Sequence, residues 1–311
     1  RSGAAAVGNS DSGEYQFAGF NITLPGVIQF NVSPYEQDTL AVDSSLTEYA
    51  FCHEGKYYAF KPIWNSATMN YDQMDCVVFN TADWEKDDSV RLNIANQGEV
   101  PYITLYDNTT GQFYCISMMS TYKTHTDSYE LNILDPTTFK MTKVGHICSW
   151  TWMDDEHQQS INGAVMINGE IIAIDNYNRL VKIDKNTGAL SIIGKMKIGY
   201  SSPQHPDYDQ ITGLQGMVYE ESTGDIIISH LDYLEGAYLY RVHPNDITDG
   251  VISTEKMDEL YSTYYYIYAQ NSGMSAARLT SPSDFKIEMN DMKANISFTV
   301  PSKMVNGTQL S

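Results

Sequence analysis

Short runs of apolar residues alternate with polar turns along almost the whole chain, and helical periodicity is nearly absent. Val, Ile, Tyr and Phe dominate the runs, while Gly, Asn, Asp and Thr separate them. Runs of about four to eight such residues, bounded by turn-forming residues, are typical of β-strands. The pattern therefore predicts an all-β protein.

One unit of this pattern occurs five times: an apolar strand closed by a polar residue, then a polar turn and a second strand. The five copies are Val27–Val42, Cys76–Asn93, Glu130–Gly145, Arg179–Gly194 and Leu239–Thr254. The polar residues that close the first strand are Asn31, Asn80, Asp135, Asp184 and His243. They follow one another at intervals of roughly 50 positions, which is typical of the four-stranded blades of a β-propeller.

Each later copy is preceded by a hairpin with a glycine in its turn. The turns are at His53–Gly55, Asn108–Gly111, Asn168–Gly169 and Ser222–Gly224. Such turns place glycine where φ is positive. We expect the hairpin to supply strands A and B of a blade, and the repeated unit to supply strands C and D.

The first copy has only Tyr15–Thr23 before it, which is too little for a hairpin. A closed ring completes such a blade with a strand from the far end of the chain, here around Tyr264–Ala269, and closure removes open sheet edges. We therefore expect five blades. Six is the alternative, if the segment after Leu260 forms its own blade.

The domain organisation follows from the repeat. Residues 1–285 are expected to form the propeller, and residues 286–311 a C-terminal strand or tail. The alternating run Ala294–Val300 predicts a strand. This strand either packs on the ring or begins a β-sandwich module.

Two blade-like segments, Leu180–Met196 and Gly213–Ile228, resemble blades of secreted bacterial YncE-like propellers. In that family a strand, an Asp-x-x-Thr-Gly turn and a glycine-led strand recur, and the likeness extends over roughly residues 160–255. The ending Lys293–Ser311 is similar to the start of fibronectin type III modules that follow such propellers in surface lipoproteins of Gram-negative gut anaerobes. The resemblance implies an exported protein at the cell surface, and it transfers no catalytic residue.

Charge narrows the range of partners. The chain has 311 residues with 19 basic and 39 acidic side chains, a net charge of −20. Nucleic-acid binding requires a basic surface, so nucleic acid is excluded as a partner. No run of about 18 apolar residues occurs, so no membrane-spanning helix is expected. The first residues are small and polar, which indicates that a signal peptide is absent or removed.

The four cysteines lie next to apolar residues, without a CxxC or HxxxH pattern. Cys52 and Cys76 fall on strands A and C of one blade, and Cys115 and Cys148 on strands B and D of the next. Such strands are next-nearest neighbours about 9.5 Å apart, beyond disulfide reach. We expect buried, unpaired thiols and no metal site.

In a propeller, the A–B and C–D turns open on one face of the ring, and the B–C and D–A connections open on the other. We call these the hairpin face and the loop face. Long connections are expected on the loop face at Lys61–Asp75, Ser120–Ser128, Ser149–Ser160 and Gly199–Gln210. The loop face is therefore the predicted working surface.

The four connections concentrate aromatic rings, histidines and carboxylates, and twelve of these residues are predicted to contact a ligand. They are Trp64, Tyr71, Tyr122, His125, Trp150, Trp152, Asp154, Asp155, His157, His205, Tyr208 and Asp209. Aromatic faces flanked by carboxylates suit saccharides, because sugar C–H surfaces stack on the rings while hydroxyls form hydrogen bonds. Trp152 is the expected main anchor.

The same residues allow simpler interpretations. Trp150 and Trp152 fill gaps between blades if they are packing residues, and the histidines are solvated if they bind nothing. The acidic cluster Asp154–Glu156 suits a hard cation such as Ca²⁺, which takes six to eight oxygen ligands, but a solvated acidic loop is the favoured interpretation.

Two functions compete. A noncatalytic module that binds a glycan or a surface protein is favoured, because the chain has no GxSxG, phosphate-loop or HExxH motif. The alternative is a glycoside hydrolase or lyase that uses carboxylates of the loop face. Hydrolysis needs two carboxyl groups about 5–9 Å apart, so Asp75 or Asp209 would have to face the acidic cluster. No cofactor is expected.

Overall fold

The structure is a computed structural model, built of β-strands and turns, and the part of the chain that it describes contains no helix. The described residues are 5–6, 17–21, 26–32, 35–47, 49–81, 83–94, 98–121, 126–151, 159–196, 198, 214–221, 223–232, 236–260, 265–267, 283–290 and 293–299. These residues therefore include no helix that could cross a membrane.

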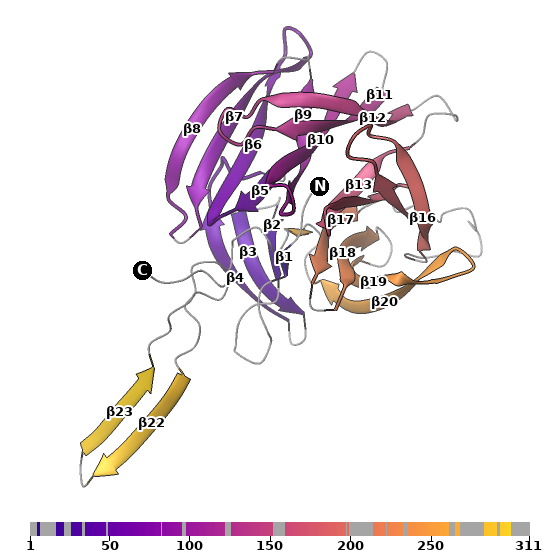
Figure 1. Cartoon of the computed structure of the whole chain (residues 1–311). Coiled ribbons are helices and arrows are strands. Elements are labelled where there is room, and N and C mark those ends of the chain that lie inside the picture. Colours follow the sequence, from indigo (N-terminus) through magenta and orange to yellow (C-terminus); the bar gives the residue numbers. More distant parts are fainter. Residues whose placement is uncertain are drawn as a thin grey trace.

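The strands form the five blades of a β-propeller (Figure 1). Blade 1 contains β1 (Ala5–Ala6), β2 (Phe17–Asn21), β3 (Gly26–Val32), β4 (Tyr35–Val42) and β21 (Tyr265–Ile267). Blade 2 contains β5 (Ala50–His53), β6 (Lys56–Asn65), β7 (Asn70–Asn80) and β8 (Lys86–Asn93). Blade 3 contains β9 (Glu99–Asp107), β10 (Gln112–Thr121), β11 (Thr126–Leu134) and β12 (Met141–Thr151).

Blade 4 contains β13 (Ile161–Ile167), β14 (Glu170–Asp175), β15 (Arg179–Ile183) and β16 (Leu190–Met196). Blade 5 contains β17 (Leu214–Glu220), β18 (Asp225–Asp232), β19 (Gly236–Thr248) and β20 (Val251–Leu260). Consecutive strands within each blade pair antiparallel. The expected all-β propeller of five blades is confirmed.

The predicted hairpin turns explain where the strands reverse. In blade 2, Glu54 and Gly55 have φ of 47° and 75°, and in blade 4 Asn168 and Gly169 have φ of 50° and 77°. Two successive residues with positive φ match the right-handed twist of the flanking strands. The sequence therefore places these A–B turns correctly.

Apolar side chains fill the spaces between neighbouring blades. One cluster joins Phe20 and Val27 of blade 1 to Tyr57 and Phe79 of blade 2. Further clusters join blade 2 to blade 3, blade 3 to blade 4, and blade 4 to blade 5. Blades 2, 3 and 4 therefore bury apolar side chains on both faces, and each depends on its neighbours for stability.

Both ends of the ring meet in blade 1. β21 pairs antiparallel with β2 from Gly19↔Ile267 to Asn21↔Tyr265, and β1 pairs with the preceding part of the same strand. β21 also contacts β17 of blade 5. The expected strand from the far end is confirmed, and it closes the ring between blades 5 and 1.

The outer strands of blades 4 and 5 are joined. β16 pairs parallel with β20 at Lys195↔Val251 and Met196↔Ile252, and the Lys195 N–H donates to the carbonyl of Gly250 at 2.8 Å. A side chain at Gly194 would place its Cβ 2.8 Å from Ile252, so glycine permits this approach. Blades 4 and 5 consequently share one eight-stranded sheet.

Four predicted boundaries are wrong. Most of the expected loop Lys61–Asp75 is strand, because β6 and β7 continue as a long hairpin whose turn is only Ser66–Met69. Likewise Ser120 and Ser149 lie within strands. His243 does not close its strand either: a register shift follows it, and β19 continues to Thr248 before the Asp249–Gly250 turn.

The C-terminal residues form a separate hairpin of β22 (Ser283–Asn290) and β23 (Lys293–Thr299), which lies away from the ring in Figure 1. The strand expected from the alternating run is therefore present. The proposed domain boundary at residue 285 lies within β22, and the division into two domains stays a prediction.

The cysteines occupy the strands that were expected. Cys52 lies on β5 and Cys76 on β7, with β6 between them, while Cys115 and Cys148 are separated by β11. All four are buried free thiols. Burial raises the pKa of Cys76, Cys115 and Cys148 to about 12, so these thiols are unreactive at neutral pH.

Candidate functional site

The loop-face end of blade 2 carries a pair of aromatic rings, one of them exposed. Trp64, near the end of β6, is 46% exposed and stands opposite Tyr71 on β7. Their ring centroids are 5.3 Å apart and the ring planes meet at 75°. This edge-to-face arrangement is favourable for aromatic pairs. We call Trp64 and Tyr71 the Trp64 corner.

Hydrogen bonds hold the backbone beneath this corner. The Asp72 carboxylate accepts from Asn65 Nδ2 and from Thr68 Oγ1, each at 2.7 Å, and so ties the two sides of the hairpin together. The N–H of Gly98, just before β9, donates to the Tyr71 carbonyl at 3.1 Å. The hairpin tip is therefore attached to the start of blade 3 and presents the corner on a fixed base.

The third described aromatic residue of the predicted site lies at the same end of blade 3. Trp150 on β12 is half-buried and stands opposite Asp127 on β11. One position further, the hydroxyls of Thr126 and Thr151 are 3.3 Å apart. Since β11 begins and β12 ends on the loop face, Trp150 shares that face with the Trp64 corner.

Blade 4 contributes a polar turn that sequence reasoning missed. Asp175, fully buried at the end of β14, accepts from the N–H groups of Tyr177 and Arg179, each at 3.0 Å. Its other carboxylate oxygen is 2.6 Å from Arg179 Nη2 and accepts from Gln159 Nε2 at 3.1 Å. Arg179 also lies over the Tyr177 ring at 4.8 Å. The sequence signal that could have revealed this turn is Asp175 at the end of an apolar run, with Arg179 four positions later.

The remaining predicted site residues are not placed by the structure. Tyr122, His125, Trp152, Asp154, Asp155, His157, His205, Tyr208 and Asp209 lie outside the described residues. Of the predicted set, the structure thus brings Trp64 and Tyr71 into contact and puts Trp150 on the same face. Within the described ranges, no three His, Cys, Asp or Glu side chains are grouped so that they could hold a metal ion.

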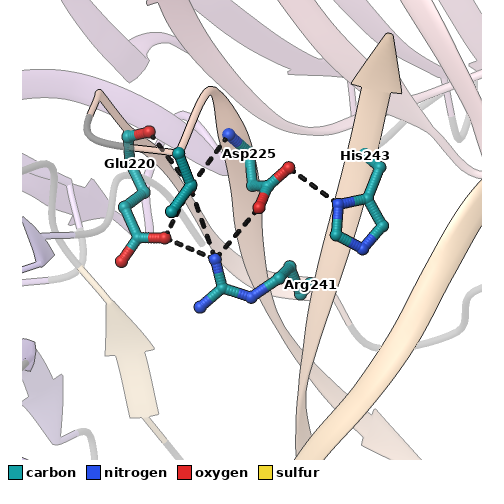
Figure 2. A network of polar contacts seen from close by, with 5 residues as sticks. Glu220, Asp225, Arg241 and His243 are labelled. Carbon is teal, nitrogen blue, oxygen red and sulfur yellow. Dashed lines mark hydrogen bonds and ion pairs between the residues drawn. The ribbon is translucent and has the colours of Figure 1, made fainter. Parts of the chain in front are cut away.

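A polar network occupies the opposite, hairpin-face end of blade 5 (Figure 2). Arg241 on β19 pairs with Glu220 and, at 3.1 Å, with Asp225, which flank the β17–β18 turn. Asp225 also bonds His243 Nδ1 at 2.8 Å. Burial raises the pKa of Asp225, but the hydrogen bonds from His243 and Arg241 outweigh it and hold the pKa below its ordinary value. The network ties the turn to β19.

The described part of the loop face therefore offers stacking surfaces and hydrogen-bonding groups. An exposed indole, a neighbouring phenol and amide or carboxylate groups within one hairpin can contact the C–H face and the hydroxyls of a sugar. Two of the carboxylates there are already engaged: Asp72 bonds two neighbours, and Asp175 is paired with Arg179. The arrangement suits binding.

No known family model matches the sequence, and no curated protein does. Several solved structures are similar in shape. They include YjhT, with 10% identity and a TM-score of 0.42 over 70% of this chain and 65% of that one. A protein of unknown function from Bacteroides thetaiotaomicron has 15% identity and a TM-score of 0.43, over 81% of this chain and 60% of that one.

A GH43 endo-arabinanase from Bacillus licheniformis has 12% identity and a TM-score of 0.38, over 84% of this chain and 97% of that one. The chain spans less than two thirds of the length of YjhT and of the Bacteroides protein. At these identities and TM-scores, the likenesses carry no inference about activity. What the chain does must be argued from its own residues.

Proposed function

We propose that this propeller is an exported binding module of the cell surface that recognises an uncharged saccharide on its loop face. The observation that carries the proposal is the Trp64 corner, an exposed indole against a partly buried phenol on a hairpin fixed by hydrogen bonds. Large exposed aromatic side chains are common anchors of recognition sites, because a ligand that covers them removes much apolar surface from water.

Charge supports an uncharged ligand. With a net charge of −20, the protein repels polyanions at long range, whereas a neutral sugar is unaffected. The repeated blades present a broad face, which favours glycan binding over glycoside hydrolysis. Export and a cell-surface location rest on the resemblance to surface propellers and are part of the proposal.

The test is a glycan microarray, followed by titration calorimetry with the neutral oligosaccharide that gives the strongest signal. Trp64→Ala should weaken binding at least tenfold, which is about 1.4 kcal/mol, because a stacking ring is lost at an anchor position. The melting temperature should change little, since nearly half of Trp64 is already exposed.

Trp84 provides the matched control. It lies on the β7–β8 turn of the same blade, on the hairpin face, and packs against Tyr57 at a ring distance of 5.6 Å. Trp84→Ala should lower the melting temperature and leave the affinity of the folded protein unchanged. An equal loss of affinity in both variants would contradict the proposed site, and so would an unchanged affinity in Trp64→Ala.

A further inference from the structure

The outer strands of blade 3 hold a second group of side chains, which is independent of the saccharide proposal. Ser149 Oγ on β12 lies 3.4 Å from His146 Nε2, and His146 Nδ1 lies 3.2 Å from Glu130 Oε1 on β11. The imidazole thus connects a hydroxyl to a carboxylate through its two ring nitrogens. A nucleophile, a base and a group that orients the base are linked in this order in serine hydrolases.

A β-bulge creates this contact. Tyr129 pairs with Cys148, but Glu130 pairs with His146, so Ile147 is an extra residue on β12. In a regular strand, residues three positions apart point to opposite faces. The extra residue brings His146 and Ser149 to the same face, and it also puts His146 opposite Glu130. Bulges often re-aim side chains at functional sites.

Glu130 is held as a buried, charged group. Its side chain is 11% exposed, Ser128 Oγ donates to it at 3.0 Å, and Lys143 Nζ pairs with it at 3.0 Å. Burial raises the pKa of Glu130, but the hydrogen bonds from Lys143, His146 and Ser128 outweigh it, so the pKa lies below its ordinary value. A fixed carboxylate at Nδ1 favours the tautomer with the proton on Nδ1, which leaves Nε2 free to accept from Ser149.

The reacting atoms are accessible. The His146 side chain is half exposed, and β12 is the outermost strand of blade 3, with β11 as its pairing neighbour. The Ser149 carbonyl accepts from the Gln159 N–H at 3.1 Å, so it points away from β11. Because the N–H and C=O of one strand residue point to the same edge, the Ser149 N–H also points outward. A donor beside the nucleophile suits a developing oxyanion.

We propose that Ser149, His146 and Glu130 form a nucleophilic site that hydrolyses small carboxylic esters. Ser149 Oγ bonds to the ester carbonyl carbon while its proton passes to His146 Nε2. The carbon–oxygen bond to the leaving alcohol then breaks, and that alcohol takes the proton from Nε2. Water attacks the acyl group, gives a proton to Nε2, and releases the acid as Ser149 regains its proton. Glu130 acts as a positioning residue.

The experiment combines hydrolysis of p-nitrophenyl acetate with labelling by a fluorophosphonate probe, using the full chain. Wild type should turn over the ester and carry the label on Ser149, as located by mass spectrometry of the digested protein. Ser149→Ala should abolish labelling, and both Ser149→Ala and His146→Gln should lower kcat/KM at least a hundredfold. Glu130→Gln should lower kcat more than it changes KM.

Ser191→Ala is the matched control, because Ser191 is an exposed serine on β16, the outer strand of the next blade. Its rate and labelling should equal those of wild type, and Ser149→Ala should melt at the wild-type temperature. A wild-type protein that is neither labelled nor active would overturn the proposal. So would a label on another residue, or an unchanged rate in folded Ser149→Ala.

Discussion

Asp107 shows how a single buried charge can hold two blades together. The residue ends β9 of blade 3, and its fully buried carboxylate accepts from Thr109 Oγ1 at 2.6 Å and pairs with Lys185 Nζ of blade 4 at 2.6 Å. Burial raises the pKa of Asp107, but the hydrogen bonds from Lys185 and Thr109 outweigh it and keep the pKa well below its ordinary value. The carboxylate therefore stays charged at any ordinary pH.

Asp107→Ala should lower the free energy of unfolding by about 3 kcal/mol, because it leaves the ammonium of Lys185 without its partner at the blade interface. Denaturant titration measures this difference. Glu170→Ala is the control, since the Glu170–Lys182 pair of blade 4 is largely exposed and contributes little. Similar losses in the two variants would contradict the role given to Asp107.

His53 links stability to pH. Its ring packs against Tyr106 and Phe113 of blade 3, with centroid distances of 4.2 and 4.8 Å, and burial lowers its pKa below the ordinary 6.5. The unfolded chain therefore binds a proton at this site more readily than the folded protein. Stability then falls as the pH drops below about 6.5.

We expect His53→Phe to lose less stability than wild type when the pH is lowered from about 7.5 to about 5.5, because the variant has no proton to bind there. Urea titrations at the two pH values measure both losses. Parallel losses in the two proteins would show that His53 does not contribute to the pH dependence.

At the scale of elements, close contacts between turns and strands of neighbouring blades set which residues are tolerated. Gly145 on β12 is the tightest described case: a Cβ at this position would lie 1.9 Å from the Thr187 carbonyl oxygen in the C–D turn of blade 4. The obstacle is backbone, which cannot move aside like a flexible side chain.

Gly145→Ala should therefore cost about 1–3 kcal/mol by forcing blades 3 and 4 apart. Thr142→Ala, at an exposed position of the same strand, should have almost no effect. Thermal melts of the two variants measure the difference. A melting temperature of Gly145→Ala equal to that of Thr142→Ala would show that the turn yields easily.

The positions of turns could be predicted where the backbone conformation of one residue determines the geometry. The ends of strands could not, because they depend on pairing between several strands. The Glu54–Gly55 and Asn168–Gly169 turns were found because their positive φ favours glycine and asparagine. Over Lys61–Asp75, Pro62 and the polar residues predict a loop, yet cross-strand pairing continues through most of the segment.

Side-chain sites were harder to predict than strands. Trp64 and Tyr71 were found because large aromatic residues near a turn are conspicuous in sequence. The contact between Ser149 and His146 was missed, because their spacing indicates opposite faces unless a bulge is present. Nothing in a single strand reveals the bulge, since it depends on the register with β11.

At the scale of the whole molecule, stability depends on the strand that closes the ring. β21 covers the inner edge of β2 and contacts β17, whereas β22 and β23 pair with each other. An uncovered β2 would leave blade 1 with an open edge next to blade 5.

A chain that ends at Leu260 should therefore melt several degrees lower than the full chain, at roughly 2–4 °C for each kcal/mol lost. A chain that ends at residue 282 keeps β21 and loses the terminal hairpin, so its melting temperature should stay close to that of the full chain. Calorimetry of both truncated proteins tests this. Equal melting temperatures would mean that β21 is dispensable.

The position of β21 late in the sequence also determines when the ring can close during folding. β2 is made before the strands of blades 2 to 5, and β21 is made only after all the other strands of the ring. During synthesis the blades can form one by one, but the edge of β2 at Gly19–Asn21 waits uncovered until β21 is made. Contacts between distant parts of a chain form slowly. The closing step is therefore late, and a nascent ring needs protection from other strand edges until β21 has been made.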